Sequence, residues 1–283
     1  MYAVSNEPGE TFEMCQGADR QTLSGYCRRR SFAFQCKCAW YCSKECQKAN
    51  WRFHKLTCPE VERSSGVAKL IGSLGMNPLL MAFIRIGVIF DCGLLDNPQR
   101  LGFDMPFMAR VDFAIEPSEI LDFSGLYLND RPVGEKLQGM IQVNALTTWD
   151  PTKQGPLTPE QLRLWREARA KYNTNGFAID LVGLIEFVNC ADDNSFISEL
   201  FIPTVVVNMA REHEPLNANV AACLQCVNLN IRADKQNQLL LRTEMTEQDK
   251  EIICSASRNE ETFPSRILKE KMKREPLYTN ILN

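Results

Sequence analysis

Residues 41–58 read YCSKECQKANWRFHKLTC, and this stretch decides how the N-terminal part of the chain folds. Cys42 and Cys46 are four residues apart, as are His54 and Cys58, so each pair can lie on one helix face and share a metal ion. Thiolate and imidazole groups bind zinc tetrahedrally, four to a closed structural site. The stretch therefore predicts a zinc-binding module.

The cysteines that precede this stretch extend the same prediction. Seven of the twelve cysteines fall within the first 58 residues, and the other five are scattered over the rest of the chain. Together with one of the two histidines they make eight ligands, the number that two closed zinc sites need: Cys15, Cys27, Cys36, Cys38, Cys42, Cys46, His54 and Cys58. So polar a segment has little core of its own, and zinc binding worth ~10 kcal/mol or more can supply the missing folding energy.

The spacing of residues 41–58 closely resembles the second half of a MYND-type zinc finger. That family's pattern is Tyr-Cys, three residues, Cys-Gln, three residues, Trp, two residues, His, three residues, Cys, and every position is matched. The resemblance implies two interleaved zinc ions. The implied ligand sets are Cys15, Cys27, Cys42 and Cys46 for the first ion, and Cys36, Cys38, His54 and Cys58 for the second.

The first half of the finger departs from the family pattern, in which two residues separate each of the first two pairs of cysteines. Here eleven residues separate Cys15 from Cys27, and one separates Cys36 from Cys38. In an alternative alignment Cys27 is the family's first cysteine, Arg30 replaces the second, and Cys15 is left over. The ligand count of eight favours the complete site.

The resemblance also implies a binding surface, because the MYND family binds short proline-rich peptides beside the second half of the finger. The matching residues are Gln47 and Trp51. A polyproline helix loses little entropy when it docks, and an aromatic face offers it a platform. The alternative for Trp51 is packing in the small core of the finger.

Charge and hydropathy restrict the other partners. Residues 1–63 hold ten basic and seven acidic side chains, but seven thiolates and two Zn²⁺ would add three negative charges, so nucleic acid is an unlikely partner. The longest apolar run, Leu79–Phe90, has twelve residues and contains Arg85, which is too short for a membrane span. Residues 1–10 lack the apolar core of a secretory signal, so we expect a protein of the cytoplasm or nucleus, where thiols stay reduced.

The remaining sequence predicts a mixed α+β domain over residues 67–283, preceded by a polar tail (1–14), the finger (15–58) and a linker (59–66). Thr158, Pro159 and Gln161 give the signature of a capped helix over 159–172. The other expected helices cover residues 67–74, 79–95, 219–231 and 246–255, with a solvated helix end over 269–274. The expected strands cover residues 140–148, 177–189 and 201–207, and Val111, Phe113 and Ile115 indicate a half-buried strand.

We find no sequence motif in this larger domain that indicates a catalytic activity. The Asn-His-Ser turn of SET methyltransferases is absent, since Asn189-Cys190 lacks the histidine, and the spacing of His213, Cys223 and Cys226 does not fit a zinc deaminase. Cys223 and Cys226 are expected as small buried residues of a helix. We therefore expect an adaptor whose finger binds a partner protein. The alternative is an enzyme whose active site in residues 67–283 the sequence does not reveal.

Overall fold

The computed structural model describes residues 66–129, 134, 136–213 and 219–282, together with four short strands in the first 41 residues. The chain divides into two compact units, Met1–Lys69 and Leu70–Asn283. In the first unit the strands form two antiparallel pairs: β1 (Tyr2–Val4) with β2 (Phe12–Met14), and β3 (Phe32–Ala33) with β4 (Trp40–Tyr41). Residues 1–14, expected as a polar tail, thus contain the first of these strand pairs.

The second unit is built on a five-stranded mixed sheet in the order β8-β7-β5-β6-β9. Its strands are β5 (Met108–Pro117), β6 (Gln138–Thr148), β7 (Leu181–Asn189), β8 (Ser195–Ile202) and β9 (Arg242–Glu244). β5 and β7 run parallel, whereas the other neighbours are antiparallel, and the register of β5 and β6 shifts at Asp112 and Phe113. Helices and strands do not alternate regularly, which confirms the α+β class.

Helices surround this sheet, and two of them begin at the capping residues that the sequence predicts. They are α3 (Gly66–Gly75), α4 (Pro78–Asp91), α5 (Ile120–Leu128), α6 (Pro151–Gln154), α7 (Pro159–Thr174), α8 (Thr204–His213), α9 (Val220–Ala233), α10 (Glu247–Ser257), α11 (Phe263–Arg274), the 3₁₀ turn η2 (Pro276–Tyr278) and α12 (Thr279–Leu282). Thr158 and Gln161 form the expected capping box of α7, and Thr246 and Asp249 form that of α10.

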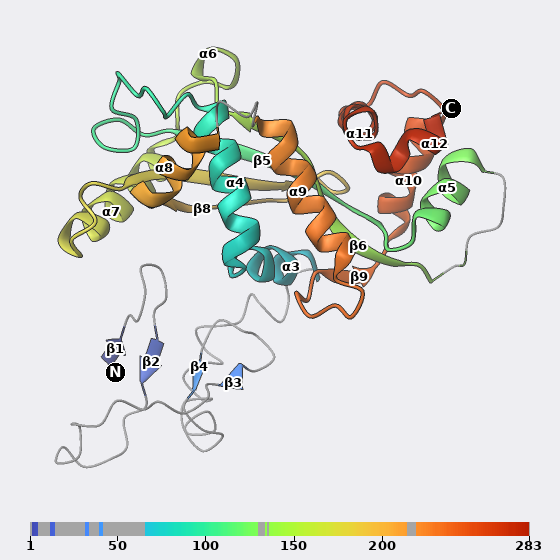
Figure 1. Ribbon diagram of the computed structural model, residues 1–283, viewed down its shortest axis with the longest axis horizontal. Helices are drawn as coiled ribbons and strands as arrows, with labels where there is room; N and C mark the ends of the chain where they lie inside the picture. The colour runs from blue at the N-terminus through green and yellow to red at the C-terminus, as the bar shows by residue number, and fades with distance from the viewer. Residues whose placement is uncertain are drawn as a thin grey trace. The chain divides into compact units, whose positions relative to one another are not determined.

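The helices cover both faces of the sheet. Figure 1 shows α4 and α9 running across the same face, where Gly87 of α4 approaches Leu146 of β6. Leu146 pairs with Val111, whose side chain points away from the face that carries Met108. On that opposite face, α7 packs an apolar cluster against β7 and β8: Met108, Trp165, Ala168, Tyr172, Val182, Leu184 and Phe201. α5, α10, α11 and α12 gather at one end of the sheet (Figure 1).

Two predicted strands have different bounds in the structure. The strand expected over 201–207 ends at Ile202, because Thr204 begins α8 and its backbone N–H donates to the Asp180 carboxylate at 2.6 Å. The strand expected over 177–189 begins at Leu181. The preceding turn is held by Arg169, whose guanidinium donates to the carbonyl oxygens of Phe177 and Asp180. Both differences arise because residues next to the strand ends are held by partners elsewhere in the chain.

The strand expected to be half-buried is covered on both faces. In β5 every residue except Arg110 is buried, including Asp112 and Glu116 on the face that the alternating pattern assigned to solvent. The prediction was wrong because C-terminal helices cover the second face. In the described ranges no single helix is long and apolar enough to cross a membrane; α3 and α4 together reach such a length but meet at 83°.

Close packing of β7 against the segment before β5 gives the first prediction. A Cβ added at Gly183 would lie 2.3 Å from two ring atoms of Phe107, which is itself buried. We expect Gly183→Ala to lower the free energy of unfolding by ~1–3 kcal/mol, because the ring must shift within a packed core. Gly72→Ala is the control. Gly72 lies inside α3, and a Cβ added there would meet no atom of another part of the structure within 4 Å, so alanine should be neutral or slightly stabilising in urea unfolding.

Candidate functional site

The predicted zinc ligands and peptide-binding residues lie outside the described residues. These are Cys15, Cys27, Cys36, Cys38, Cys42, Cys46, His54 and Cys58 for zinc, and Gln47 and Trp51 for the peptide. Seven thiols and one imidazole are a soft donor set that suits zinc. The described strands add that Cys36 and Cys38 fall in the connection between β3 and β4, and that Cys42 follows directly after β4.

The cysteines of the second unit have a different character. Cys223 on α9 is buried, as expected, and burial raises the pKa of its thiol to about 11, while Cys226 is half-buried. Burial likewise raises the pKa of Cys92 to about 11. Such thiols are protonated near neutral pH and are poor ligands and nucleophiles. Within the part of the chain that the structure describes, no three histidine, cysteine or acidic side chains gather as a metal site, and the His213 side chain lies outside that part.

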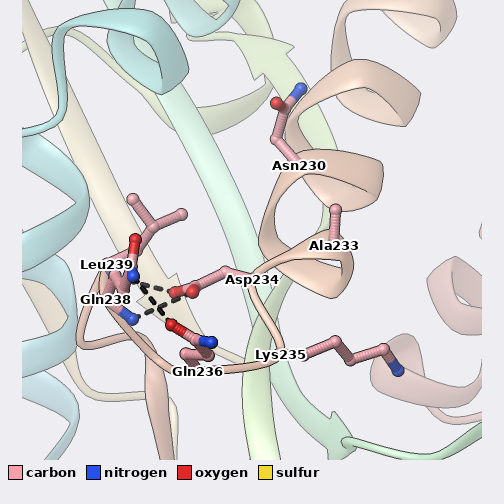
Figure 2. A pocket seen from close by; sticks show the side chains of 7 residues that line it. All are labelled: Asn230, Ala233, Asp234, Lys235, Gln236, Gln238 and Leu239. Carbon is pink, nitrogen blue, oxygen red and sulfur yellow. Dashed lines mark hydrogen bonds between the residues drawn. The ribbon is translucent and has the colours of Figure 1, made fainter.

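A shallow depression of 410 Å³ opens at the end of α9 and is shown in Figure 2. It is lined by Asn230, Ala233, Asp234, Lys235, Gln236, Gln238 and Leu239. The Asp234 carboxylate accepts hydrogen bonds from the backbone N–H groups of Gln238 and Leu239, at 2.9 and 2.7 Å. Since these bonds close the loop that leads to β9, the carboxylate has a structural role here.

A group of buried charges surrounds Glu116 near the end of β5. This carboxylate is 1% exposed and accepts from Lys271 Nζ at 2.5 Å, Arg232 Nη2 at 2.8 Å and the Tyr278 hydroxyl at 2.6 Å. The Lys271 ammonium also lies 3.4 Å from the side-chain oxygen of Gln142. We call Glu116, Lys271, Arg232 and Tyr278 the Glu116 cluster; it joins β5, α9, α11 and η2.

The position of Lys271 corrects the prediction of a solvated helix end over residues 269–274. Lys271 has no exposed surface, and it shares the inner face of α11 with the buried Leu268 and Met272. Its neighbours Lys269 and Lys273 are more exposed, so the segment reads as uniformly charged. Lys271 differs from them in its place on the inner helix face and in its pairing with the distant carboxylate of Glu116.

A second set of polar contacts closes the edge of β6 beside this cluster. β9 pairs only with the start of β6, and the last bond of this ladder runs from the Ile141 N–H to the Leu241 carbonyl. Beyond that point the Asn228 side chain binds the backbone of β6. Its Oδ1 accepts from the Val143 N–H and its Nδ2 donates to the Val143 carbonyl, both at 2.8 Å. The amide thus stands in for a neighbouring strand. Its remaining N–H is bound by Glu275 at 2.7 Å.

The electrostatics of the Glu116 cluster fix its protonation. Burial alone would raise the pKa of Glu116, but the charges of Lys271 and Arg232 outweigh it and hold that pKa below the ordinary value. Burial lowers the pKa of Lys271, which Glu116 partly offsets, and burial raises the pKa of Tyr278 well above 10, so the phenol stays a donor. The cluster is enclosed, and Lys271, Arg232 and Tyr278 all bind the Glu116 carboxylate, although the buried Nε of Arg232 has no hydrogen-bond partner among the described residues. The cluster is a structural joint between the C-terminal segment and the sheet.

The lowered pKa of Glu116 predicts how stability depends on pH. The unfolded chain binds a proton near pH 4.5 and the folded chain only at lower pH, so the stabilisation by the Glu116 charge is present above pH 4.5 and lost on acidification. Glu116→Gln should lower the free energy of unfolding by ~3–5 kcal/mol at pH 7, because it leaves buried cations without their carboxylate. The difference in the free energy of unfolding between the wild type and Glu116→Gln should become smaller towards pH 3, as measured by urea unfolding.

Glu160→Gln is the control for this experiment, because Glu160 carries an exposed ion pair with Arg163 on α7. It should leave the free energy of unfolding nearly unchanged at every pH. The finger is the same in all three proteins, so the differences between them report on the larger unit. A gap between wild type and Glu116→Gln that stays constant from pH 7 to pH 3 would contradict the assignment.

Comparison with known proteins finds two families. A MYND finger matches residues 24–58, which include seven of the eight predicted ligands and begin after Cys15. A family described as a domain of unknown function (DUF8205) matches residues 63–219 and 198–278. No curated protein and no solved structure matches. MYND fingers bind zinc and commonly bind protein partners. Because the second match spans most of the chain, the protein belongs to the DUF8205 family and carries an N-terminal MYND finger.

Proposed function

We propose that the chain is an adaptor whose finger binds a proline-rich segment of a partner protein, with the DUF8205 domain as its folded support. The observation that carries this proposal is the MYND match over residues 24–58, because such fingers typically bind proline-rich protein motifs. A closed zinc site has no open coordination position, so its metal holds a fold and leaves recognition to the surface. We place the protein where thiols stay reduced, in cytoplasm or nucleus, since its free cysteines are numerous.

Gln47 and Trp51 are the residues that we propose for the peptide groove. They fall at the family's Gln and Trp positions, between the ligand pairs Cys42 with Cys46 and His54 with Cys58. The indole offers a flat apolar face to proline rings, and the Gln47 amide can bind the unpaired carbonyls of a polyproline helix. A single aromatic anchor and a short peptide fit a micromolar or weaker complex.

The buried charged groups of the DUF8205 domain support this proposal, because they stabilise the fold. The enclosed charges of the Glu116 cluster bind one another, and the buried thiols have raised pKa values. A domain arranged in this way is suited to holding a shape. The recognition chemistry then falls to the finger.

Metal content tests the proposed finger. The wild-type chain should contain two zinc ions by elemental analysis, and the double variant Cys42→Ala, His54→Ala should contain none, because each of the two sites loses a ligand. Cys254→Ala on α10 is the control and should keep both ions. Cys15→Ala should lose one ion. A single ion in the wild type, unchanged in Cys15→Ala, would contradict the pairing of Cys15 with Cys27.

Peptide binding tests the groove. In fluorescence anisotropy against a panel of labelled proline-rich peptides, Trp51→Ala should abolish binding while both zinc ions stay, because neither Gln47 nor Trp51 is a predicted ligand. Phe263→Ala, at an exposed site on α11, is the control and should bind as the wild type does. Loss of zinc or of folding in Trp51→Ala would assign the indole to the core instead. Strong weakening by salt would favour the basic residues Arg28, Arg29 and Arg30.

A further inference from the structure

β8 is an edge strand whose outer backbone groups face no other described strand. On β7, the N–H groups of Val182 and Leu184 bond on the side away from β8, to Gly102 and Phe107. The Asn189 N–H bonds towards β8, to the carbonyl of residue 194. Alternation along an antiparallel pair then points the backbone groups of residues 194, 196, 198, 200 and 202 to β7. Residues 195, 197 and 199 point theirs outward.

The outer edge of β8 lacks the features that usually protect an exposed edge. Residues 195–202 read SFISELFI, with no lysine, arginine or proline. Their one charged side chain, Glu199, already accepts hydrogen bonds from Lys171 Nζ at 2.8 Å and from the Tyr172 hydroxyl at 3.0 Å. Long, weakly charged edge strands of this kind accept a further strand. Among the described elements, β8 has only β7 as a paired strand.

Exposed apolar side chains accompany this edge on α8, the helix that follows β8. Val206 and Ala210 are buried, and Arg211 donates to the Leu95 carbonyl beyond the end of α4. Helical geometry therefore places Val205 and Met209 on the side of α8 away from Leu95. Their exposed fractions are 62% and 39%, and that of Ile197 on the strand is 37%. α8 packs on α4, so it covers the same sheet face as α4.

We propose that β8 pairs antiparallel with β8 of a second copy of this chain, on a twofold axis through Ile197. In this register the two Ile197 side chains lie opposite each other, and each Glu199 lies opposite a Ser195 hydroxyl. A register centred on Glu199 would instead set two acids opposite each other, which is unfavourable. The register through Ile197 therefore keeps the two Glu199 side chains apart and sets two apolar side chains together at its centre.

The occupant is a second copy because of the apolar side of α8. A twofold axis perpendicular to the sheet keeps the α8 helices of both copies on one face, so their Val205 and Met209 sides meet across the new strand pair. A bare peptide strand would satisfy the backbone groups of β8 but would leave both side chains in water. The assembly would be one continuous sheet of ten strands, five from each copy.

Sedimentation equilibrium of the full-length chain tests this proposal. The wild type should be a dimer in the micromolar range. Ile197→Pro should raise the dimer dissociation constant at least ~tenfold, because it removes an outward N–H and leaves the β7 ladder intact. Val205→Lys should weaken the dimer without touching the strand. Leu121→Lys makes the same kind of change at an exposed site on α5 and should leave the dimer unchanged.

Hydrogen exchange provides a second readout. Amide exchange in residues 195–202 should slow as the wild-type concentration rises, and this dependence should vanish in Val205→Lys. Two results would overturn the proposal. One is a wild type that stays monomeric up to high micromolar concentration. The other is a dimer that survives both Val205→Lys and Ile197→Pro, because it would form through another surface, the finger included. If Ile197→Pro fails to fold, Val205→Lys and the exchange measurement decide the matter alone.

Discussion

The larger domain depends on the burial of a single carboxylate, that of Glu116. A buried charge is tolerated only when it is paired and hydrogen-bonded, and here the partners come from α9, α11 and η2, more than a hundred residues further along the chain. The second face of β5 can therefore be covered only once the C-terminal helices are in place. Helices that read in the sequence as a charged C-terminal extension are for this reason part of the core.

The two edges of the sheet are treated differently. At the β6 edge, β9 is only three residues long, and the ladder is continued by the Asn228 amide and by Arg274, which donates to the Asn144 carbonyl at 3.1 Å. Side chains thus satisfy backbone groups that a neighbouring strand would otherwise bind. At the β8 edge the outward groups of residues 195, 197 and 199 have no such side chains in the described part of the chain. The β6 edge is therefore closed by the fold itself. The open β8 edge is the one that we propose for association with a second copy.

Signals carried by neighbouring residues could be read from the sequence, and signals that depend on distant partners could not. The capping boxes at Thr158 and Thr246 involve residues three apart, so both helix starts were predicted correctly. The spacing of the predicted metal ligands in residues 41–58 is equally local, and it identified the finger family. The burial of Glu116 and Lys271 was missed because the two are 155 residues apart. Alternation gives the period of a strand and does not say whether helices cover its second face.

The two units are stabilised by different means. The finger has too few apolar residues for a core, so metal ligation provides its stability, whereas the larger domain rests on a buried core and the Glu116 cluster. Substitutions in the larger domain can therefore change stability or association without touching a zinc ligand. A finger that binds one short peptide weakly gains most from being carried twice, because the second binding event becomes intramolecular and avidity can exceed single-site affinity by ~10²–10⁴. Pairing through β8 would give the assembly that second finger while leaving both zinc modules unaltered.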